Sequence, residues 1–417
     1  MAQGSILIKT EVSCVLILSR GIVPESMVEI AVEPCATDGN TPDHLLVEVD
    51  SPTTASLHSG SEGSLNDSQV LVQVVRFVFT ANTLTYAVAG KMPVLNYFGN
   101  FPAPTSGYAR PVCWGCGVVV ASRCDVPVGT RIYGLLAMSK FVTLTPEVAA
   151  SGTQFVDVAP HRENILLPYK TYFTSSDDLY RDLSMEEEDF QLAAGNLFST
   201  GWSMSQEAAT HPAAPSAVLI TSASSRTAFA AAFAAHFHKL ALKVIGLTSA
   251  GNLDFTRNLG VYDEVLSYED IPSLDVQKIA VYDLSGNDHV KQGIYKHFRD
   301  MVVTFGQVGM THIESQRVNL ETFGGARPSS FLVFEAMQAL KKPFGGGRKL
   351  SAALADATNA YKAKVFPSFQ AEREYGADET LAIFRRMARN EASPGITYVC
   401  SLWPKGQEEP DVSASRI

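Results

Sequence analysis

The turn between two expected elements at residues 218–233 carries side chains that could bind a phosphate. The stretch VLITSASSRTAFAAAF runs from a buried strand, through a turn of small residues, into an alanine-rich helix. The polar members of the turn are Ser222, Ser224, Ser225, Arg226 and Thr227. Hydroxyl and guanidinium groups donate to phosphate oxygens, and a helix N-terminus adds free N–H groups. The turn therefore favours phosphate binding, although serines also serve simply as helix caps.

This turn contains no glycine, which separates it from the usual dinucleotide-binding loop. Glycines in such a loop allow the tight bend, the approach of the backbone to the pyrophosphate and close packing of helix on strand. Ala228 keeps the small size at the helix-packing position. We expect the hydroxyl side chains to replace part of the contact that the glycine backbone would make.

A second strand, KVIGLTSAGN, ends at Thr248 and Ser249. An NAD-binding protein usually has an acidic residue here, about 20 residues after the loop, which binds the ribose 2′-hydroxyl. No acid is present in this stretch, so nothing would repel a 2′-phosphate. Ser249, Asn252 and Arg226 could donate to that phosphate, which favours NADPH over NADH.

A parallel sheet would position these residues, and the sequence from residue 216 has the pattern that predicts one. Strands alternate with helices, and the expected strands are AVLIT, KVIGLTS, DEVLSY, KIAVYDLSG and DMVVTFGQVG. Such alternation predicts an α/β fold with a doubly wound parallel sheet, whose ligands bind at the carboxyl ends of the strands. Residues 69–146 instead read as strands throughout, and the segment after 341 as two helices and a last strand, GITYVCSLW.

The composition disfavours some classes of binding partner. The 417 residues carry a net charge of −10, which disfavours nucleic acid and anionic membranes as partners. The sequence has no apolar run of the ~20 residues that a membrane-spanning helix needs, and no signal peptide is evident. Six cysteines in a chain of this length do not form a disulfide framework. We expect a cytoplasmic protein.

Three cysteines have a spacing that hints at zinc. Cys113, Cys116 and Cys124 lie within CWGCGVVVASRC. A structural zinc site needs four ligands, and residues three apart on a strand point to opposite faces. We therefore predict buried thiols and no metal.

Several segments, taken in order, resemble the zinc-independent quinone oxidoreductases of the medium-chain dehydrogenase/reductase superfamily. The resemblance spans roughly residues 69–312 and places the chain in a branch with a serine-rich loop in place of the glycine-rich one. The segments that carry it are VLVQVVRFVFTAN, WGCGVVVAS, VGTRIYGLL, LFSTGW, KVIGLTSAGNLDFTRNLGVYDEVLSYED, AVYDLSGN and MVVTFGQVG.

The resemblance implies a Rossmann-like nucleotide-binding domain at 197–340. It also implies a β-rich, GroES-like catalytic domain formed by 1–196 together with 341–417, with a cleft between the two. The implied activity is NADPH-dependent and metal-free reduction of an activated C=C bond, a quinone or a carbonyl of a small hydrophobic substrate by hydride transfer. Gly306 would lie at the cofactor, and a homodimer is the assembly to test.

The resemblance also implies the residues nearest the chemistry. Asn82 and Thr200 would lie beside the nicotinamide and the substrate. Tyr86, one helical turn beyond Asn82, could polarise a carbonyl or deliver a proton. Tyr97 and Tyr108 are rivals for this role. Two other classes remain open: a non-redox cyclase or isomerase on the same scaffold, and an inert NADPH-binding protein.

Overall fold

The computed structural model describes most of the chain beyond residue 64. The described residues are 65–88, 90, 96–102, 110–308, 323–389, 391–393 and 395–412, with the backbone of three earlier strands. Those strands, β1 (Leu16–Ile17), β2 (Glu29–Glu33) and β3 (His44–Glu48), form a small sheet in the order β1-β3-β2. Tyr108 lies outside the described residues.

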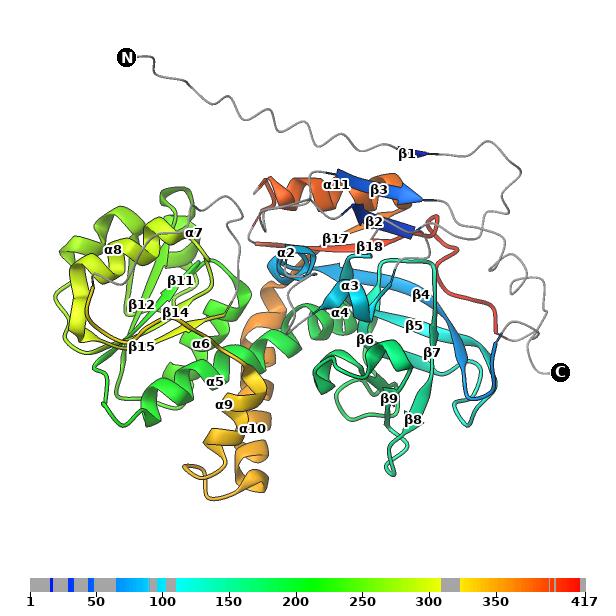
Figure 1. Cartoon of the computed structure of the whole chain (residues 1–417), viewed down its shortest axis with the longest axis horizontal. Coiled ribbons are helices and arrows are strands. Elements are labelled where there is room, and N and C mark those ends of the chain that lie inside the picture. The colour runs from blue at the N-terminus through cyan, green and yellow to red at the C-terminus, as the bar shows by residue number, and fades with distance from the viewer. Residues whose placement is uncertain are drawn as a thin grey trace, which may run out of the picture.

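A nine-stranded sheet forms the β-rich part of the molecule (Figure 1). Its order is β17-β18-β4-β5-β6-β10-β9-β8, with β7 also paired to β4. The strands are β4 (Val70–Phe79), β5 (Val112–Ser122), β6 (Arg131–Ala137), β7 (Phe141–Leu144), β8 (Pro146–Val148), β9 (Gln154–Asp157), β10 (Thr171–Thr174), β17 (Gln370–Tyr375) and β18 (Ile396–Ser401). The C-terminal segment therefore completes a sheet that begins about 300 residues earlier.

The sequence predicts only helices and a final strand after residue 341, and so it misses the strand β17. The helices are present as α9 (Val333–Leu340), α10 (Gly347–Val365) and α11 (Ala377–Ala388). Between α10 and α11, β17 pairs in parallel with β18 at the edge of the sheet. Its sequence, QAEREY, lacks an apolar run because an edge strand tolerates charge.

The second sheet has six strands, all parallel, in the order β13-β12-β11-β14-β15-β16. Its strands are β11 (Ala217–Thr221), β12 (Lys243–Thr248), β13 (Glu264–Ser267), β14 (Ile279–Asp283), β15 (Val302–Gln307) and β16 (Ser329–Ser330). Its helices are α5 (Asn196–Thr210), α6 (Arg226–Phe237), α7 (Leu253–Asn258) and α8 (Asp288–Phe298). The expected doubly wound parallel sheet is confirmed.

Alternating side chains on β11 explain why helices cover both faces of this sheet. Val218 and Ile220 pack with the alanines of α6, whereas Leu219 packs with α8 through Ile294 and Phe298. A strand buried on both faces is apolar throughout, as AVLIT is. Figure 1 shows α8 on one side of the sheet and α5 and α6 on the other.

The helices α5 and α6 approach each other closely at Gly201. A Cβ atom at this position would lie 2.5 Å from the Thr227 carbonyl oxygen and 2.6 Å from the Ala231 nitrogen. Only a glycine fits so near another helix backbone. This contact fixes the start of α6, and with it the preceding turn, against α5.

A buried network of charges joins the connecting helix α4 (Met185–Phe190) to the β-rich sheet. Glu188 and Asp189 are buried, and Arg76 bonds to both of them, its Nε donating to Asp189 Oδ1 at 2.6 Å. Arg131 also binds Glu188, and Arg373 of β17 binds Asp189. Removing one partner from such a network typically costs about 3–5 kcal/mol, because a buried charge is left uncompensated.

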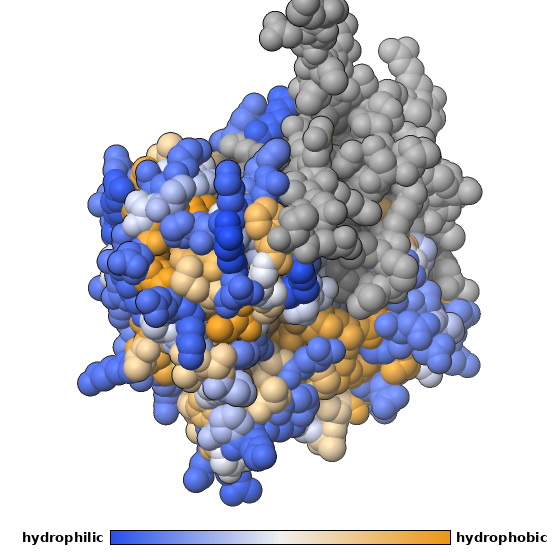
Figure 2. All heavy atoms as spheres, turned by 60° about the vertical axis from the view of Figure 1, so that its left-hand side comes forward, coloured by the Kyte–Doolittle hydropathy of each residue, from blue (hydrophilic) through white to orange (hydrophobic). Residues whose placement is uncertain are grey.

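The described surface carries both hydrophilic and apolar side chains. Figure 2 shows one face on which hydrophilic side chains prevail at the rim and apolar ones gather near the centre. No described helix has the length and apolar character needed to cross a membrane.

Candidate functional site

The turn after β11, at the carboxyl edge of the parallel sheet, contains no glycine and leads directly into α6. Ser222 has φ 49°, in the left-handed region where glycine is usual, and its N–H donates to the Tyr268 hydroxyl at 3.1 Å. The helix α6 then begins at Arg226, with the Ser225 side chain accepting from the Ala228 N–H. The first-turn N–H groups of Arg226 and Thr227 have no acceptor among the described residues. They are donors that an anion could use.

A buried pair of side chains at the ends of two strands stabilises this turn. The Thr221 hydroxyl donates to Asp283 at 2.7 Å, and both residues are 0% exposed. The same Asp283 oxygen accepts from the N–H and hydroxyl of Ser285 and from the N–H of Gly286. Sequence reasoning missed this pair. Its signal was a lone carboxylate at the end of an otherwise apolar strand, KIAVYD.

Two expected cofactor-binding residues that follow neighbouring strands meet at the turn. The Asn252 side-chain amide donates to the Ser224 hydroxyl at 3.4 Å. Thr248 is buried at the end of β12, whereas Ser249 is exposed just beyond it. The carboxyl ends of β11 and β12 thus present neighbouring hydroxyl and amide groups.

The side chain of Arg226 does not join this group. Its guanidinium donates to the Thr397 hydroxyl of β18 and lies 5.7 Å from the centre of the Phe369 ring. It therefore faces the β-rich sheet and not Ser249 and Asn252. The expected contact of Arg226 with a 2′-phosphate finds no support in this orientation of the side chain and stays a prediction.

Gly306 is explained by packing. It lies in β15, where a Cβ atom would be 2.9 Å from the ring of Tyr282 and 3.3 Å from Phe331. The neighbouring tyrosine thus requires a glycine here, with or without a ligand. Its expected contact with a cofactor stays a prediction.

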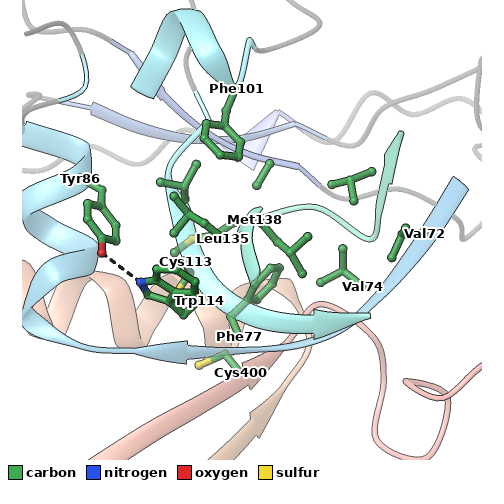
Figure 3. Packing of buried hydrophobic residues seen from close by; sticks show 14 of the residues in the cluster. Val72, Val74, Phe77, Tyr86, Phe101, Cys113, Trp114, Leu135, Met138 and Cys400 are labelled. Carbon is green, nitrogen blue, oxygen red and sulfur yellow. Dashed lines mark hydrogen bonds between the residues drawn. The ribbon is translucent and has the colours of Figure 1, made fainter. Parts of the chain in front are cut away.

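Asn82 and Tyr86 lie together on α2 (Ala81–Val88), which follows β4 directly. Tyr86 is 6% exposed, and its hydroxyl accepts the Trp114 indole N–H at 3.0 Å (Figure 3). Asn82 is also hydrogen-bonded to this hydroxyl. Burial raises the pKa of Tyr86 far above its ordinary value, so the phenol stays neutral. A neutral phenol held in this way is a hydrogen-bond donor and not a base.

Tyr97, the described rival, belongs to the same cluster. Its ring centre lies 4.9 Å from that of Tyr86 and 5.4 Å from that of Tyr169. It begins the short helix α3 (Tyr97–Asn100), is 1% exposed, and its hydroxyl is hydrogen-bonded to Tyr169. Sequence reasoning missed Trp114 and Tyr169, which distant segments bring to the cluster.

Thr200 lies apart from that cluster, within the helix that packs on α6. It immediately precedes Gly201, whose close contact with the Thr227 backbone was described above. The structure therefore brings Asn82 and Tyr86 together on α2 and places Thr200 on α5, next to the glycine that contacts α6.

Two of the three cysteines are buried as expected, whereas Cys124 lies beyond the end of β5 and is only half-buried. Cys113 and Cys116 are both buried in β5, but in different hydrophobic cores on opposite faces. Burial raises the pKa of Cys113 to about 12, so it is an unreactive thiol. Among the residues that the structure describes, no cluster of three or more His, Cys, Asp or Glu side chains could hold a metal ion.

Together, the two sheets and the turn between β11 and α6 define a protein with the fold of the quinone oxidoreductases. The chain belongs to the family described as "Protein of unknown function (DUF2855)", whose model matches residues 77–393. Among curated proteins, no sequence matches it.

Solved structures share the fold at low sequence identity. A mycobacterial protein solved with NADPH is 16% identical, with a TM-score of 0.54 over 90% of this chain and 99% of that one. CurA from Vibrio vulnificus, also in complex with NADPH, is 10% identical, with a TM-score of 0.55 over 90% and 98%. The quinone oxidoreductase of Escherichia coli complexed with NADPH is 14% identical, with a TM-score of 0.52 over 89% and 99%.

Proposed function

We propose that this protein is an NADPH-dependent, metal-free oxidoreductase. It would reduce an activated C=C bond, a quinone or a carbonyl of a small hydrophobic substrate by hydride transfer. The observation that carries the proposal is the meeting of Ser224 and Asn252 beside open helix N–H groups, at the carboxyl edge of a parallel sheet. The division into domains at 197–340 and at 1–196 with 341–417 is part of the same proposal.

The residues present fit such a nucleotide. The hydroxyls of Ser222, Ser224 and Thr227 and the first-turn N–H groups of α6 would bind phosphate oxygens. Ser225 caps the helix and so keeps those N–H groups pointing outward. Thr248, Ser249 and Asn252 would surround the ribose and donate to its 2′-phosphate.

The nicotinamide, when bound, supplies the hydride. Negative charge then develops on the carbonyl oxygen of an enone or quinone, and a positioned donor must stabilise it. Tyr86 would donate to that oxygen, because burial keeps it protonated and Trp114 and Asn82 fix its hydroxyl. Thr200, on the other sheet's side, would help to orient the ring.

Titration with reduced nucleotide tests the cofactor, and turnover tests the chemistry. We expect NADPH to bind more tightly than NADH when followed by nicotinamide fluorescence. Loss of the reduced-nicotinamide absorbance with a panel of enones, quinones and aldehydes should then reveal the acceptor. Binding of NADPH without turnover of any acceptor would favour the alternative of an inert NADPH-binding protein. Failure to bind either nucleotide would reject the proposal.

A further inference from the structure

Tyr169 is the most exposed member of the cluster that it forms with Tyr86 and Tyr97. Its ring centre lies 5.4 Å from that of Tyr97 and 6.1 Å from that of Tyr86. Tyr86 and Tyr97 are buried, whereas Tyr169 is half-buried. Of these three tyrosines, Tyr169 is therefore the one that a molecule arriving from solvent meets first.

A short turn on either side of Tyr169 fixes its position. Tyr169 ends the 3₁₀ helix η3 (Leu167–Tyr169), which contains a proline with a restricted backbone. The Thr171 hydroxyl donates to the Leu167 carbonyl at 2.8 Å. The Lys170 ammonium donates to the Arg162 carbonyl at 3.0 Å and so ties this turn to the preceding one. The ring of Tyr169 is thus held against the cluster by local backbone contacts.

The hydrogen bond between Tyr97 and Tyr169 has a defined direction. Burial raises the pKa of both phenols, and their mutual hydrogen bond raises the pKa of Tyr97 further but lowers that of Tyr169. A hydrogen bond stabilises the protonated form of the phenol that donates and the ionised form of the phenol that accepts. Tyr97 therefore donates to the Tyr169 oxygen, and this bond does not use the proton of Tyr169.

The hydroxyl of Tyr86 is arranged in the same way. Its oxygen accepts the Trp114 indole N–H at 3.0 Å. Burial raises the pKa of Tyr86, whereas its hydrogen bonds with Trp114 and Asn82 act in the opposite direction, as bonds accepted by the phenol oxygen do. Within the described part of the chain, no residue accepts the proton of this hydroxyl. Tyr86 and Tyr169 are therefore two phenols whose oxygens accept and whose protons stay available.

These two available protons lie close to each other. Negative charge on Tyr169 would raise the pKa of Tyr86, so the two hydroxyls are near enough to interact electrostatically. A hydroxyl whose oxygen already accepts a hydrogen bond is also a stronger donor, because linked hydrogen bonds polarise one another. One carbonyl oxygen has two lone pairs and can accept from both phenols at once.

We propose that Tyr169 is a second hydrogen-bond donor to the substrate oxygen, acting together with Tyr86, and that Tyr97 positions it. The inference rests on the proposed oxidoreductase function and narrows its substrate to a carbonyl compound, such as a quinone, an enone or an aldehyde. The developing oxyanion then receives two donors instead of one. An alkene without a carbonyl group would leave both donors unpaired.

Kinetics of single hydroxyl deletions give the first test. Tyr169→Phe keeps the ring and should lower kcat ~10- to 100-fold with a carbonyl acceptor, because a donor to the oxyanion is lost. The affinity for NADPH should stay within about twofold. Tyr375→Phe, the same change on the edge strand β17, is the matched control and should alter neither quantity. Thermal unfolding without ligand shows that each variant is folded.

A ligand that carries an oxyanion tests the donors without turnover. The probe is 4-nitrophenol, whose ionised form absorbs visible light, titrated into protein saturated with NADP⁺. Two donors should favour the ionised form at least ~10-fold and so lower the pKa of the bound probe by about 1 or more. Tyr169→Phe should reduce this shift and weaken binding of the ionised probe ~10-fold. The methyl ether 4-nitroanisole cannot ionise and should bind equally to both proteins.

A double-mutant cycle tests the part played by Tyr97. Tyr97→Phe removes the donor to Tyr169, so it should lower kcat several-fold and reduce the pKa shift of bound 4-nitrophenol. In the Tyr169→Phe background the same change should have no further effect, because Tyr97 acts through Tyr169. Independent, additive losses would overturn the positioning role of Tyr97.

The outcomes separate this inference from the proposed function. If Tyr86→Phe impairs turnover and Tyr169→Phe does not, the proposed function stands and the second donor is rejected. Equal loss of 4-nitrophenol and 4-nitroanisole in Tyr169→Phe would also reject it, since the residue would then only pack against the ring. If the unaltered protein binds no nicotinamide nucleotide, the proposed function fails, and this inference fails with it.

Discussion

Thr221 and Asp283 join the carboxyl ends of two neighbouring parallel strands by a 2.7 Å hydrogen bond between fully buried side chains. The pair fixes the point at which β11 stops and the candidate phosphate-binding turn begins. Because the same Asp283 oxygen also accepts from Ser285 and Gly286, it orders the segment after β14 as well. The stability of the fold and the shape of the turn therefore depend on one carboxylate.

We expect Asp283→Ala to lower the free energy of unfolding by about 3 kcal/mol, because several buried donors lose their acceptor. Thr221→Val keeps the shape of the side chain and removes one donor, so it should cost about 1–2 kcal/mol. Urea denaturation measures the free energy of unfolding of each variant. Equal stability of Asp283→Ala and the unaltered protein would show that the network contributes little.

Tyr86→Phe should lower kcat ~10- to 1000-fold with little change in NADPH affinity, since only a donor to the developing oxyanion is removed. Steady-state kinetics with the best acceptor and a separate NADPH titration measure the two effects. Trp114→Phe, which removes the indole N–H that fixes the hydroxyl, should give a smaller loss of kcat. Normal turnover of Tyr86→Phe would exclude Tyr86 as the donor and make Tyr97 the next candidate.

Alkaline pH should destabilise the protein through its buried tyrosines. Burial raises the pKa of Tyr172 and of Tyr361 to about 12, against about 10 in an unfolded chain. A raised pKa means that the folded state retains a proton that the unfolded state loses. This stabilisation is complete below pH ~10 and declines between pH ~10 and ~12, by about 1.4 kcal/mol per pH unit for each such tyrosine.

Urea denaturation at a series of alkaline pH values measures that slope. Tyr172→Phe removes one titrating group, although it also removes the hydrogen bond to the Leu135 carbonyl. The variant should therefore be less stable at neutral pH and lose stability less steeply above pH ~10. An unchanged slope would show that Tyr172 does not contribute to it.

Asn252→Asp should reduce the preference for NADPH. The new carboxylate would lie beside Ser224 and repel a 2′-phosphate, while it could accept from the 2′-hydroxyl of NADH. We expect the affinity ratio of NADPH to NADH to fall ~10- to 100-fold. Asn258→Asp, an exposed change at the end of the same helix, controls for net charge.

The strand–turn–helix at the centre of the site could be predicted because its signals are local. The apolar run AVLIT has the limits of β11, and Ser225 stands where a helix cap is favoured. Both features depend only on neighbours within a few residues. The helix α2, which carries Asn82 and Tyr86, lies instead in a stretch where the pattern predicted strands.

The direction of Arg226 could not be predicted in the same way. Its partner, Thr397, is 171 residues away and becomes a neighbour only when the C-terminal segment returns to the β-rich sheet. Trp114 also becomes a neighbour of Tyr86 only through tertiary pairing, here of β5 with β4. The charged strand β17 was missed for another reason, since its stability comes from pairing with β18 and from the Arg373–Asp189 contact. Tertiary contacts of this kind override local propensity.

The return of the C-terminal segment has a consequence for the order in which the chain folds during synthesis. The strands of the parallel sheet, from β11 to β16, are contiguous in the sequence and can pair before the ribosome has finished. In contrast, the edge of β4 at Phe77–Phe79 waits for Tyr398–Cys400 of β18. Until then an apolar strand edge is exposed to other nascent chains. A strand translated long after β4 is therefore the one that protects the edge of β4 from aggregation.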